Sequence, residues 1–222
     1  MNVRSVFVTG GTGYLGRQLI PALLQRGHTV KALVRKGSEQ KLPPKSTGVI
    51  GDALNQMTFT RNVAPADTFV HLIGVAHPSP SKANEFRSID LASVRESVAA
   101  AKSAGIHHFV YVSVAQPAPI MKTYLEFRRE AEEMIMSMNI NATILRPLYV
   151  IGPGHRWPLV LVPLYWLFER IPSTSDSAQR LGLVTLSQMI TALVYAVEHP
   201  SKGITIVDVP RIRATIYEAE DR

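Results

Sequence analysis

Short apolar runs alternate with longer amphipathic stretches along the whole chain. The runs predict strands at Arg4–Thr9, His28–Val34, Gly48–Ile50, Thr68–Ile73, His108–Ser113, Ala142–Leu145 and Ile204–Val209. The stretches between them predict helices at Gly13–Gln25, Leu54–Val63, Glu85–Ser103, Thr123–Met138 and Ser187–Glu198, with Gly105 as a left-handed cap. Strands that alternate with helices in this way are typical of a parallel sheet covered on both faces.

The size of the chain fits one α/β core. With 222 residues, of which 46% are hydrophobic and 18% charged, the chain can bury one sizeable core and carry a small appendage. We therefore expect a single domain over residues 1–222, a doubly wound parallel sheet. About residues 152–185 and 203–222 are expected to form a small C-terminal lobe.

The first predicted strand ends in a glycine-rich turn that leads at once into a helical pattern. Gly10, Gly13 and Gly16 lie three apart, and Gly11, Gly13 and Gly16 also fit the dinucleotide fingerprint. Glycine serves where the chain turns sharply, where backbone approaches a pyrophosphate, and where helix packs on strand. The following helix would point its free N–H groups at the phosphates. The alternative is an ordinary strand-to-helix turn.

The end of the second predicted strand indicates which dinucleotide is bound. An NAD site places a carboxylate there to accept from the ribose 2′-hydroxyl, whereas this chain has Arg35 and Lys36 and no acid before Glu39. A guanidinium and an ammonium suit the charge of a 2′-phosphate. The sequence therefore predicts NADP rather than NAD, although a basic cluster at this point is also compatible with a solvated loop.

Composition and charge exclude several other classes of protein. The basic residues behind the formal charge of +7 are mostly scattered singly, apart from the local cluster of Arg35, Lys36, Lys41 and Lys45, and no aromatics are interleaved with them, so we expect no nucleic-acid partner. The chain has no cysteine, and the adjacent His107 and His108 diverge, so no metal is expected; His71 is expected in the core. The start of the chain has no charged-then-apolar leader, which predicts a cytoplasmic protein.

The order of these segments resembles the short-chain dehydrogenase/reductase superfamily in its atypical and extended branches. The matching pieces are VFVTGGTGYLG, VKALVRK, GDALN, HLIGVA, AAKSAGIHHFVYVSV, YLEFRREAEEMI and ILRPLYVIGPG, from about Val6 to Gly154. The likeness is to NAD(P)-dependent epimerase/dehydratase-like and nitrogen-regulator-like proteins, isoflavone-type reductases and the reductase-like accessory subunit of respiratory complex I. It implies a Rossmann-type sheet with a small C-terminal cover on the substrate side.

The resemblance assigns cofactor contacts residue by residue. Asp52 would accept from the adenine amino group with Ala53 or Leu54 beside the ring, although Asp52 also suits the N-cap of the next helix. Leu72, Ile73 and Gly74 would line the adenosine, and Pro147–Val150 would lie near the nicotinamide. The pyrophosphate would be held by Gly10, Thr12, Gly13, Tyr14, Leu15 and Gly16.

The catalytic positions depart from the family pattern. Tyr124 stands where the superfamily has its acid/base, and Arg128, four residues later on the same helix face, replaces a lysine. The position of the catalytic serine falls on Val114, and Ser113 matches the strand-end serine before it and is expected at the cofactor site. Asp90 stands where the extended branch often has a structural asparagine. Alternatively, Tyr124 is a helix residue whose ring packs on the core.

These observations leave two functional interpretations. The first is an NADP(H)-dependent oxidoreductase acting on an apolar carbonyl, enone or quinone, and the second is a non-catalytic dinucleotide-binding sensor or structural protein. The apolar stretch Trp157–Phe168 is too short to span a bilayer, and it fits core, a pocket wall, or a surface meeting another subunit or a membrane interface. A small-molecule substrate is the expected partner, and a homo-oligomer or a partner subunit is compatible with the sequence.

Overall fold

A seven-stranded parallel sheet forms the centre of the molecule. The structure is a computed structural model that describes residues 3–75, 79–116, 122–153 and 182–220, so Trp157–Phe168 lies outside the described residues. The strand order is β3-β2-β1-β4-β5-β6-β9, and every neighbouring pair is parallel. The strands are β1 (Ser5–Thr9), β2 (Thr29–Val34), β3 (Thr47–Ile50), β4 (Thr68–His71), β5 (His108–Val112), β6 (Asn141–Arg146) and β9 (Ile204–Asp208). The predicted doubly wound α/β fold is confirmed.

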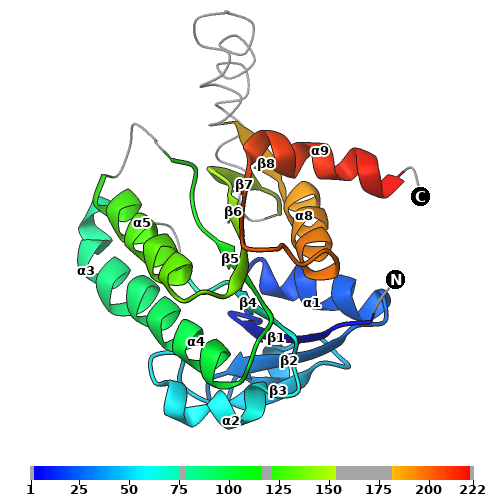
Figure 1. Ribbon diagram of the computed structural model, residues 1–222, viewed down its shortest axis with the longest axis vertical. Helices are drawn as coiled ribbons and strands as arrows, with labels where there is room; N and C mark the ends of the chain where they lie inside the picture. The colour runs from blue at the N-terminus through cyan, green and yellow to red at the C-terminus, as the bar shows by residue number, and fades with distance from the viewer. Residues whose placement is uncertain (1–2, 76–78, 117–121, 154–181, 221–222) are drawn as a thin grey trace, which may run out of the picture.

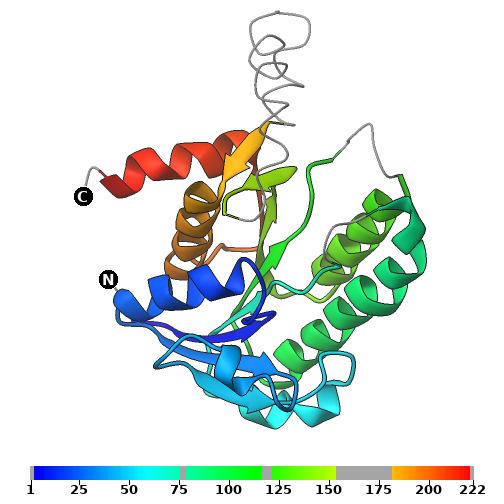
Figure 2. The same cartoon turned by 180° about the vertical axis from the view of Figure 1, so that it is seen from behind.

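Helices cover both faces of the sheet, as Figures 1 and 2 show from opposite sides. One face carries α1 (Gly16–Gln25), α8 (Leu186–Glu198) and α9 (Val209–Glu220). The other carries α2 (Thr60–Val63), α4 (Ala92–Ser103) and α5 (Lys122–Ser137). Among the described residues, no helix has the length and apolar composition that crossing a membrane requires.

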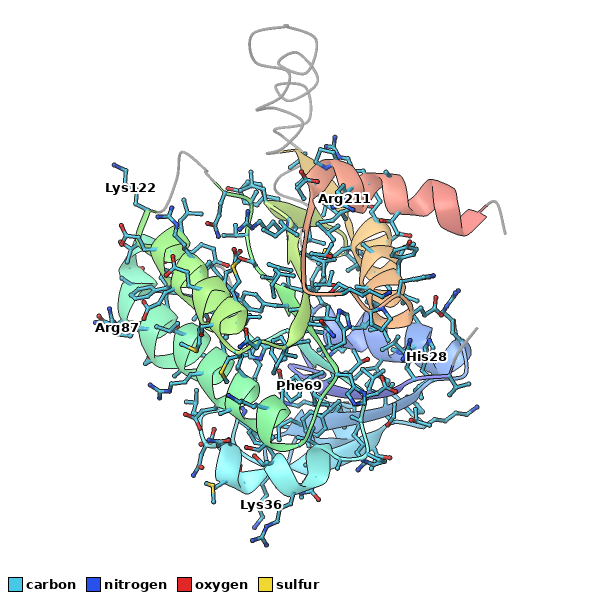
Figure 3. All side chains as sticks on the ribbon, in the orientation of Figure 1. His28, Lys36, Phe69, Arg87, Lys122 and Arg211 are labelled. Atoms are coloured by element: carbon cyan, nitrogen blue, oxygen red, sulfur yellow. The ribbon has the colours of Figure 1, made fainter. Side chains whose placement is uncertain are left out.

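The apolar runs of the sequence become strands that are buried on both faces. In β1, Val6 and Val8 face α1 and α8, whereas Phe7 points to the opposite side, as the two-residue period of a strand dictates. On that side the Phe7 and Phe69 rings lie 5.2 Å apart, and the Phe69 and Phe109 rings are also 5.2 Å apart. Figure 3 shows Phe69 in the interior of the molecule. These two clusters of side chains hold the helical layers to the sheet.

Several elements differ from the prediction. The expected helix Glu85–Ser103 begins earlier, as η3 (Pro80–Lys82), α3 (Ala83–Glu85) and a π-helical turn, η4 (Phe86–Leu91), before α4. The expected helix Leu54–Val63 is shorter, because η2 (Gln56–Thr58) precedes α2. The short η1 (Glu39–Lys41) was not predicted. Gly105 has φ +69° after α4, which confirms the predicted left-handed cap.

In the C-terminal part, β9 and α8 correspond to predicted elements, whereas α9 and two short strands were not predicted. Two strands, β7 (Tyr149–Ile151) and β8 (Leu183–Thr185), pair in parallel as a separate ladder. Strand β9 completes the central sheet by pairing with β6, and α9 follows it and packs against α8. A capping box at Thr185 and Gln188 starts α8, because each side chain bonds the backbone N–H of the other residue.

Candidate active site

The glycine turn between β1 and α1 is closely packed at Gly10 and at Gly16. Gly10 has φ +79°, and a Cβ there would lie 2.9 Å from the carbonyl carbon of Leu72. A Cβ at Gly16 would lie 2.6 Å from the Gly11 Cα. The start of α1 can therefore pack this closely against the turn only because Gly16 has no side chain. A Cβ at Gly13 would meet only the Gly10 carbonyl oxygen, at 3.1 Å. The turn is therefore tight toward the protein and leaves room on the side of Gly13.

A cavity of about 540 Å³ opens beside this turn at the carboxyl edge of the sheet. It lies where the strand order reverses between β1 and β4, the usual ligand position in open α/β sheets. Its lining includes many residues predicted for the cofactor: Gly10, Thr12, Gly13, Arg35, Asp52, Ala53, Leu54, Leu72, Ile73 and Gly74. Val75, Lys82, Glu85, Ile89 and Ser93 form a wall that the sequence did not predict. The room beside Gly13, the backbone N–H groups and Arg35 fit a dinucleotide phosphate.

Arg35 and Asp52 line the end of the cavity formed by β2 and β3. Arg35 is exposed and lines the cavity together with Ser38, whereas Lys36 is not among the lining residues and extends from the edge of the molecule (Figure 3). The Leu54 N–H donates to Asp52 Oδ1 at 2.9 Å. Asp52 does not cap the next helical turn, because Asn55 is the N-cap of η2 and accepts from the Met57 N–H. The N-cap alternative for Asp52 is therefore wrong.

Other predicted residues lie outside the cavity lining. Burial raises the pKa of Tyr14, and a Cβ at Gly152 would strike its hydroxyl. Leu15 packs against the core, and the Pro147 carbonyl accepts from the Ala115 N–H at 3.0 Å. Gly16 packs against Gly10 and Gly11 of the turn and does not line the cavity.

Ser113 is turned into the protein. It is 5% exposed, and its hydroxyl donates to the buried carboxylate of Glu132 on α5. The same carboxylate accepts from Arg146 Nε at 3.1 Å and from Gln116 at 3.1 Å. The Ser113 side chain is thus held within a structural group of ionic and polar contacts.

Tyr124 and Arg128 meet one helical turn apart, as their spacing predicts. Arg128 Nε donates to Tyr124 Oη at 3.1 Å, and the guanidinium carbon lies 5.1 Å from the centre of the Tyr124 ring. Tyr124 is half-buried and packs against Phe86, with ring centres 5.0 Å apart. The Tyr124 ring thus packs on a neighbouring aromatic ring, as the second alternative expects, while its hydroxyl takes part in a polar contact; its role as acid/base stays a prediction.

Arg128 continues from Tyr124 into a buried polar group. Its Nη1 donates to Tyr111 Oη at 2.9 Å and to the Val112 carbonyl at 3.2 Å, and its Nη2 donates to Asp90 Oδ2 at 3.0 Å. The other Asp90 oxygen accepts from the Val75 N–H at 2.6 Å. Sequence reasoning singled out Asp90 but missed Tyr111. The signal that could have found Tyr111 is a tyrosine among the apolar residues that follow His108 in β5.

This group touches the cavity through Gly74. A Cβ at Gly74 would lie 2.6 Å from Arg128 Nη2, so the guanidinium occupies the space beside this cavity-lining glycine. The Tyr124–Arg128 pair therefore lies next to the wall of the cavity that Gly74 and Val75 form.

Burial governs the electrostatics of the group. Burial raises the pKa of Asp90, while Arg128 and the Val75 N–H lower it. Burial raises the pKa of Tyr111 to about 12, although Arg128 acts in the opposite direction. Burial and the charge of Arg128 lower the pKa of His71 to about 3, so this imidazole is neutral; it bonds Thr9 and Ser97 in the core. Within the described ranges, no three His, Asp or Glu side chains gather where they could hold a metal ion.

Comparisons with known proteins agree with the geometry. The model of an NAD(P)H-binding family matches residues 10–153, well over half of the chain. Among curated proteins, the chain is 27% identical over 201 residues to a ceramide reductase of Caulobacter vibrioides, covering 90% of this chain and 62% of that protein. It is 34% identical over 114 residues to a 3-beta-hydroxysteroid dehydrogenase of Mycolicibacterium neoaurum, covering 49% of this chain and 31% of the relative. The chain thus spans less than two thirds of the length of either relative.

Solved structures share the fold over almost the whole chain. The Bordetella bronchiseptica enzyme WbmH in complex with NAD+ matches with a TM-score of 0.69 at 20% identity, covering 100% of this chain and 83% of that one. MoeE5 in complex with UDP-glucose and NAD matches with a TM-score of 0.69 at 20% identity, covering 96% and 82%. The chain therefore belongs to the NAD(P)H-binding family, and its fold is that of these NAD-bound enzymes.

Proposed function

We propose that the cavity binds NADPH and that the protein reduces an apolar carbonyl, enone or quinone substrate. The observation that carries the choice of cofactor is Arg35, which lines the cavity at the end of β2. This is the position where an NAD site places a carboxylate for the ribose 2′-hydroxyl. A guanidinium can instead form charge-assisted bonds to a 2′-phosphate.

The other lining residues support a dinucleotide whose adenosine end lies near Arg35. Asp52, Ala53 and Leu54 follow β3 and would surround the adenine, while the turn at Gly10 and Gly13 would hold the pyrophosphate. A bound nicotinamide supplies the hydride. Tyr124 would exchange the substrate proton, and Arg128 Nε would stabilise the phenol oxygen.

The names of the relatives support an apolar substrate. A ceramide reductase, a 3-beta-hydroxysteroid dehydrogenase and a farnesyl-dihydroquinoline-oxide ketoreductase of Stigmatella aurantiaca carry names that point to large apolar molecules with a hydroxyl or carbonyl group. We propose that residues of about 152–185, of which 154–181 lie outside the described residues, contribute to the cover of the substrate side, and that the protein acts in the cytoplasm. Of the second range predicted for this cover, 203–222, the part that forms β9 lies in the central sheet instead.

Calorimetric titration of two neighbouring variants tests the cofactor assignment. Arg35→Ala should lose about 1.5 to 3 kcal/mol of NADPH affinity, the usual value of a charge-assisted bond, and keep its NADH affinity. Lys36→Ala is the matched control, because Lys36 is exposed and outside the lining, and it should bind both cofactors like the wild type. Equal losses for NADPH and NADH in Arg35→Ala would show that Arg35 does not read the 2′-phosphate.

A non-catalytic dinucleotide-binding protein is the second candidate. It is favoured by Arg128, because all three nitrogens of its guanidinium donate to neighbouring protein groups, namely Tyr124, Tyr111, the Val112 carbonyl and Asp90. The residue at the lysine position therefore does not reach toward the cavity as a lone cation. NADPH oxidation with a panel of ketones, enones and quinones separates the two. Under the reductase proposal Tyr124→Phe lowers turnover about a hundredfold and keeps NADPH affinity. Wild-type turnover in this variant would refute Tyr124 as the acid/base, whereas no turnover with any probe in the wild type favours the non-catalytic function.

A further inference from the structure

The segment of residues 73–75, which follows β4, leaves the sheet and forms part of the cavity wall. Just before it, the Leu72 N–H donates to the Thr9 carbonyl at 3.1 Å. Within the described ranges of the chain, the segment itself makes one hydrogen bond, which the Val75 N–H donates to Asp90 Oδ1 at 2.6 Å. The conformation of this part of the wall therefore depends on a side chain from another element.

Asp90 reaches the 73–75 segment from the π-helical turn η4. In this turn the Ala92 N–H donates to the Arg87 carbonyl, five residues earlier in the chain. Ile89 of the turn lines the cavity, whereas Asp90 is 2% exposed and is not among the lining residues. Single π-helical turns are rare and occur frequently at functional sites. This turn lines the cavity with one residue and holds the cavity wall with the next.

Arg128 allows the Asp90 carboxylate to be buried behind the wall. A buried carboxylate is costly unless an opposite charge and hydrogen bonds compensate it. Arg128 Nη2 donates to Asp90 Oδ2 at 3.0 Å, while the other two guanidinium nitrogens donate to other protein groups. A Cβ at Gly74 would lie 2.6 Å from Arg128 Nη2, so the guanidinium also packs against the 73–75 segment. Asp90 thus holds the segment by a hydrogen bond, and Arg128 supports it by packing.

We propose that Asp90 is a positioning residue of the dinucleotide site, which holds the Val75 N–H and thereby fixes the 73–75 segment in the conformation that receives the adenosine half of the cofactor. This inference rests on the proposed function, in which a dinucleotide fills the cavity. Asp90 itself touches no ligand and acts through the backbone of Val75. Because the wall is already ordered in the free protein, binding does not lose free energy in ordering it.

Loss of the Asp90 acceptor should weaken binding without removing any contact to the cofactor. The Val75 N–H would then have no partner in the protein, and the 73–75 segment would be free to move. A ligand that binds must order the segment again, and fixing the backbone of one residue costs about tenfold in affinity. The adenosine is common to NADPH, NADH and ADP, so all three should lose affinity equally. Arg35→Ala, in contrast, should affect NADPH alone.

Two neutral double variants test the proposal as a matched pair. Asp90→Asn/Arg128→Gln removes both charges and keeps an oxygen that can accept from the Val75 N–H. Asp90→Leu/Arg128→Gln also removes both charges but has no acceptor, and neither variant leaves a buried unpaired charge. In calorimetry the first should bind NADPH, NADH and ADP within about threefold of the wild type, and the second about tenfold more weakly than the first.

Hydrogen exchange of the Val75 amide reports on the same bond without any ligand. The amide should be protected in the wild type and in the first double variant, and it should exchange fast in the second. Tyr111→Phe is the control within the same buried polar group, because it removes an acceptor of Arg128 and leaves the bond between Val75 and Asp90 in place. It should keep the affinity of the wild type for all three ligands.

Equal affinities in the two double variants would overturn the proposal, and so would fast exchange of the Val75 amide in the wild type. A loss of affinity in Tyr111→Phe as large as that in the second double variant would also overturn it, because general loosening of the buried group would then explain both. ADP has neither a nicotinamide nor a 2′-phosphate. Failure of the NADPH preference or of the reductase activity therefore leaves this result unchanged, and shows separately in the Arg35 calorimetry and the turnover assays.

Discussion

Two fully buried histidines are expected to make the fold sensitive to mild acid. His71 and His108 are both 0% exposed. Burial lowers the pKa of His71 from 6.5 to about 3 and that of His108 from 6.5 to about 4. Between these values and pH 6.5 the unfolded chain binds protons that the folded chain does not. Their contribution to stability is therefore complete above pH 6.5 and is lost progressively as the pH falls below it.

The size of the effect follows from the gap between the two states. At pH 5 an unfolded imidazole with a pKa of 6.5 is protonated, whereas both buried rings are still neutral. Each pH unit below 6.5 costs about 1.4 kcal/mol per histidine, so each ring costs about 2 kcal/mol at pH 5 and the pair about 4 kcal/mol. This is a large part of the 5 to 15 kcal/mol that holds a typical domain folded.

Urea unfolding at pH 7.5 and pH 5 measures the effect. The His71→Asn substitution places an amide near the position of the His71 Nδ1 that bonds Thr9, and His108→Gln places one near the His108 Nε2 that bonds Thr143. Neither amide can take up a proton in this pH range. The double variant should lose about 4 kcal/mol less than the wild type between the two pH values. His107→Gln is the control, because His107 is exposed, and it should lose as much as the wild type. An equal loss in the double variant and the wild type would refute the reasoning.

Three further outcomes are expected. Gly13→Val should abolish NADPH binding in calorimetry while the protein stays folded, because a side chain at Gly13 meets only the Gly10 carbonyl and otherwise extends into the phosphate position; unchanged affinity would contradict this. Gly74→Ala should lower the free energy of unfolding in urea by about 1 to 3 kcal/mol, because the added Cβ would lie 2.6 Å from Arg128 Nη2. Glu198→Gln should cost at most about 1 kcal/mol at pH 7, because the ion pair with Arg26 is partly exposed. Burial raises the pKa of Glu198, but Arg26 and His28 outweigh it and lower this pKa overall. The stability difference between Glu198→Gln and the wild type is therefore full above the usual carboxyl range, and it should disappear as the pH falls through the lowered pKa.

The sequence was sufficient to predict the sheet because its strands are buried on both faces. Such strands appear as uninterrupted apolar runs, and Val6, Phe7 and Val8 each bury a side chain on one face or the other. The glycine turn was equally visible, because backbone geometry at Gly10 and close packing at Gly16 demand a specific residue.

The contacts around the candidate catalytic pair were less accessible. The spacing of Tyr124 and Arg128 on one helix face predicted their meeting, but Asp90 is 38 residues from Arg128 and reaches it from a π-helical turn. No local pattern distinguishes that turn from ordinary helix. The short strands β7 and β8 were missed for a similar reason, since a three-residue strand has too few positions to show a period and depends on a partner distant in sequence.

The pairing of β6 with β9 has a consequence for how the chain folds. Ala142 lies beside Ile204 in the sheet, and Val6 lies beside Thr68, so the ladders join segments far apart along the chain. Sheets of this kind have a high contact order and fold slowly, because loop-closure entropy is lost before the contacts form. During synthesis the first six strands emerge well before β9, and until then β6 presents an unpaired edge to other chains.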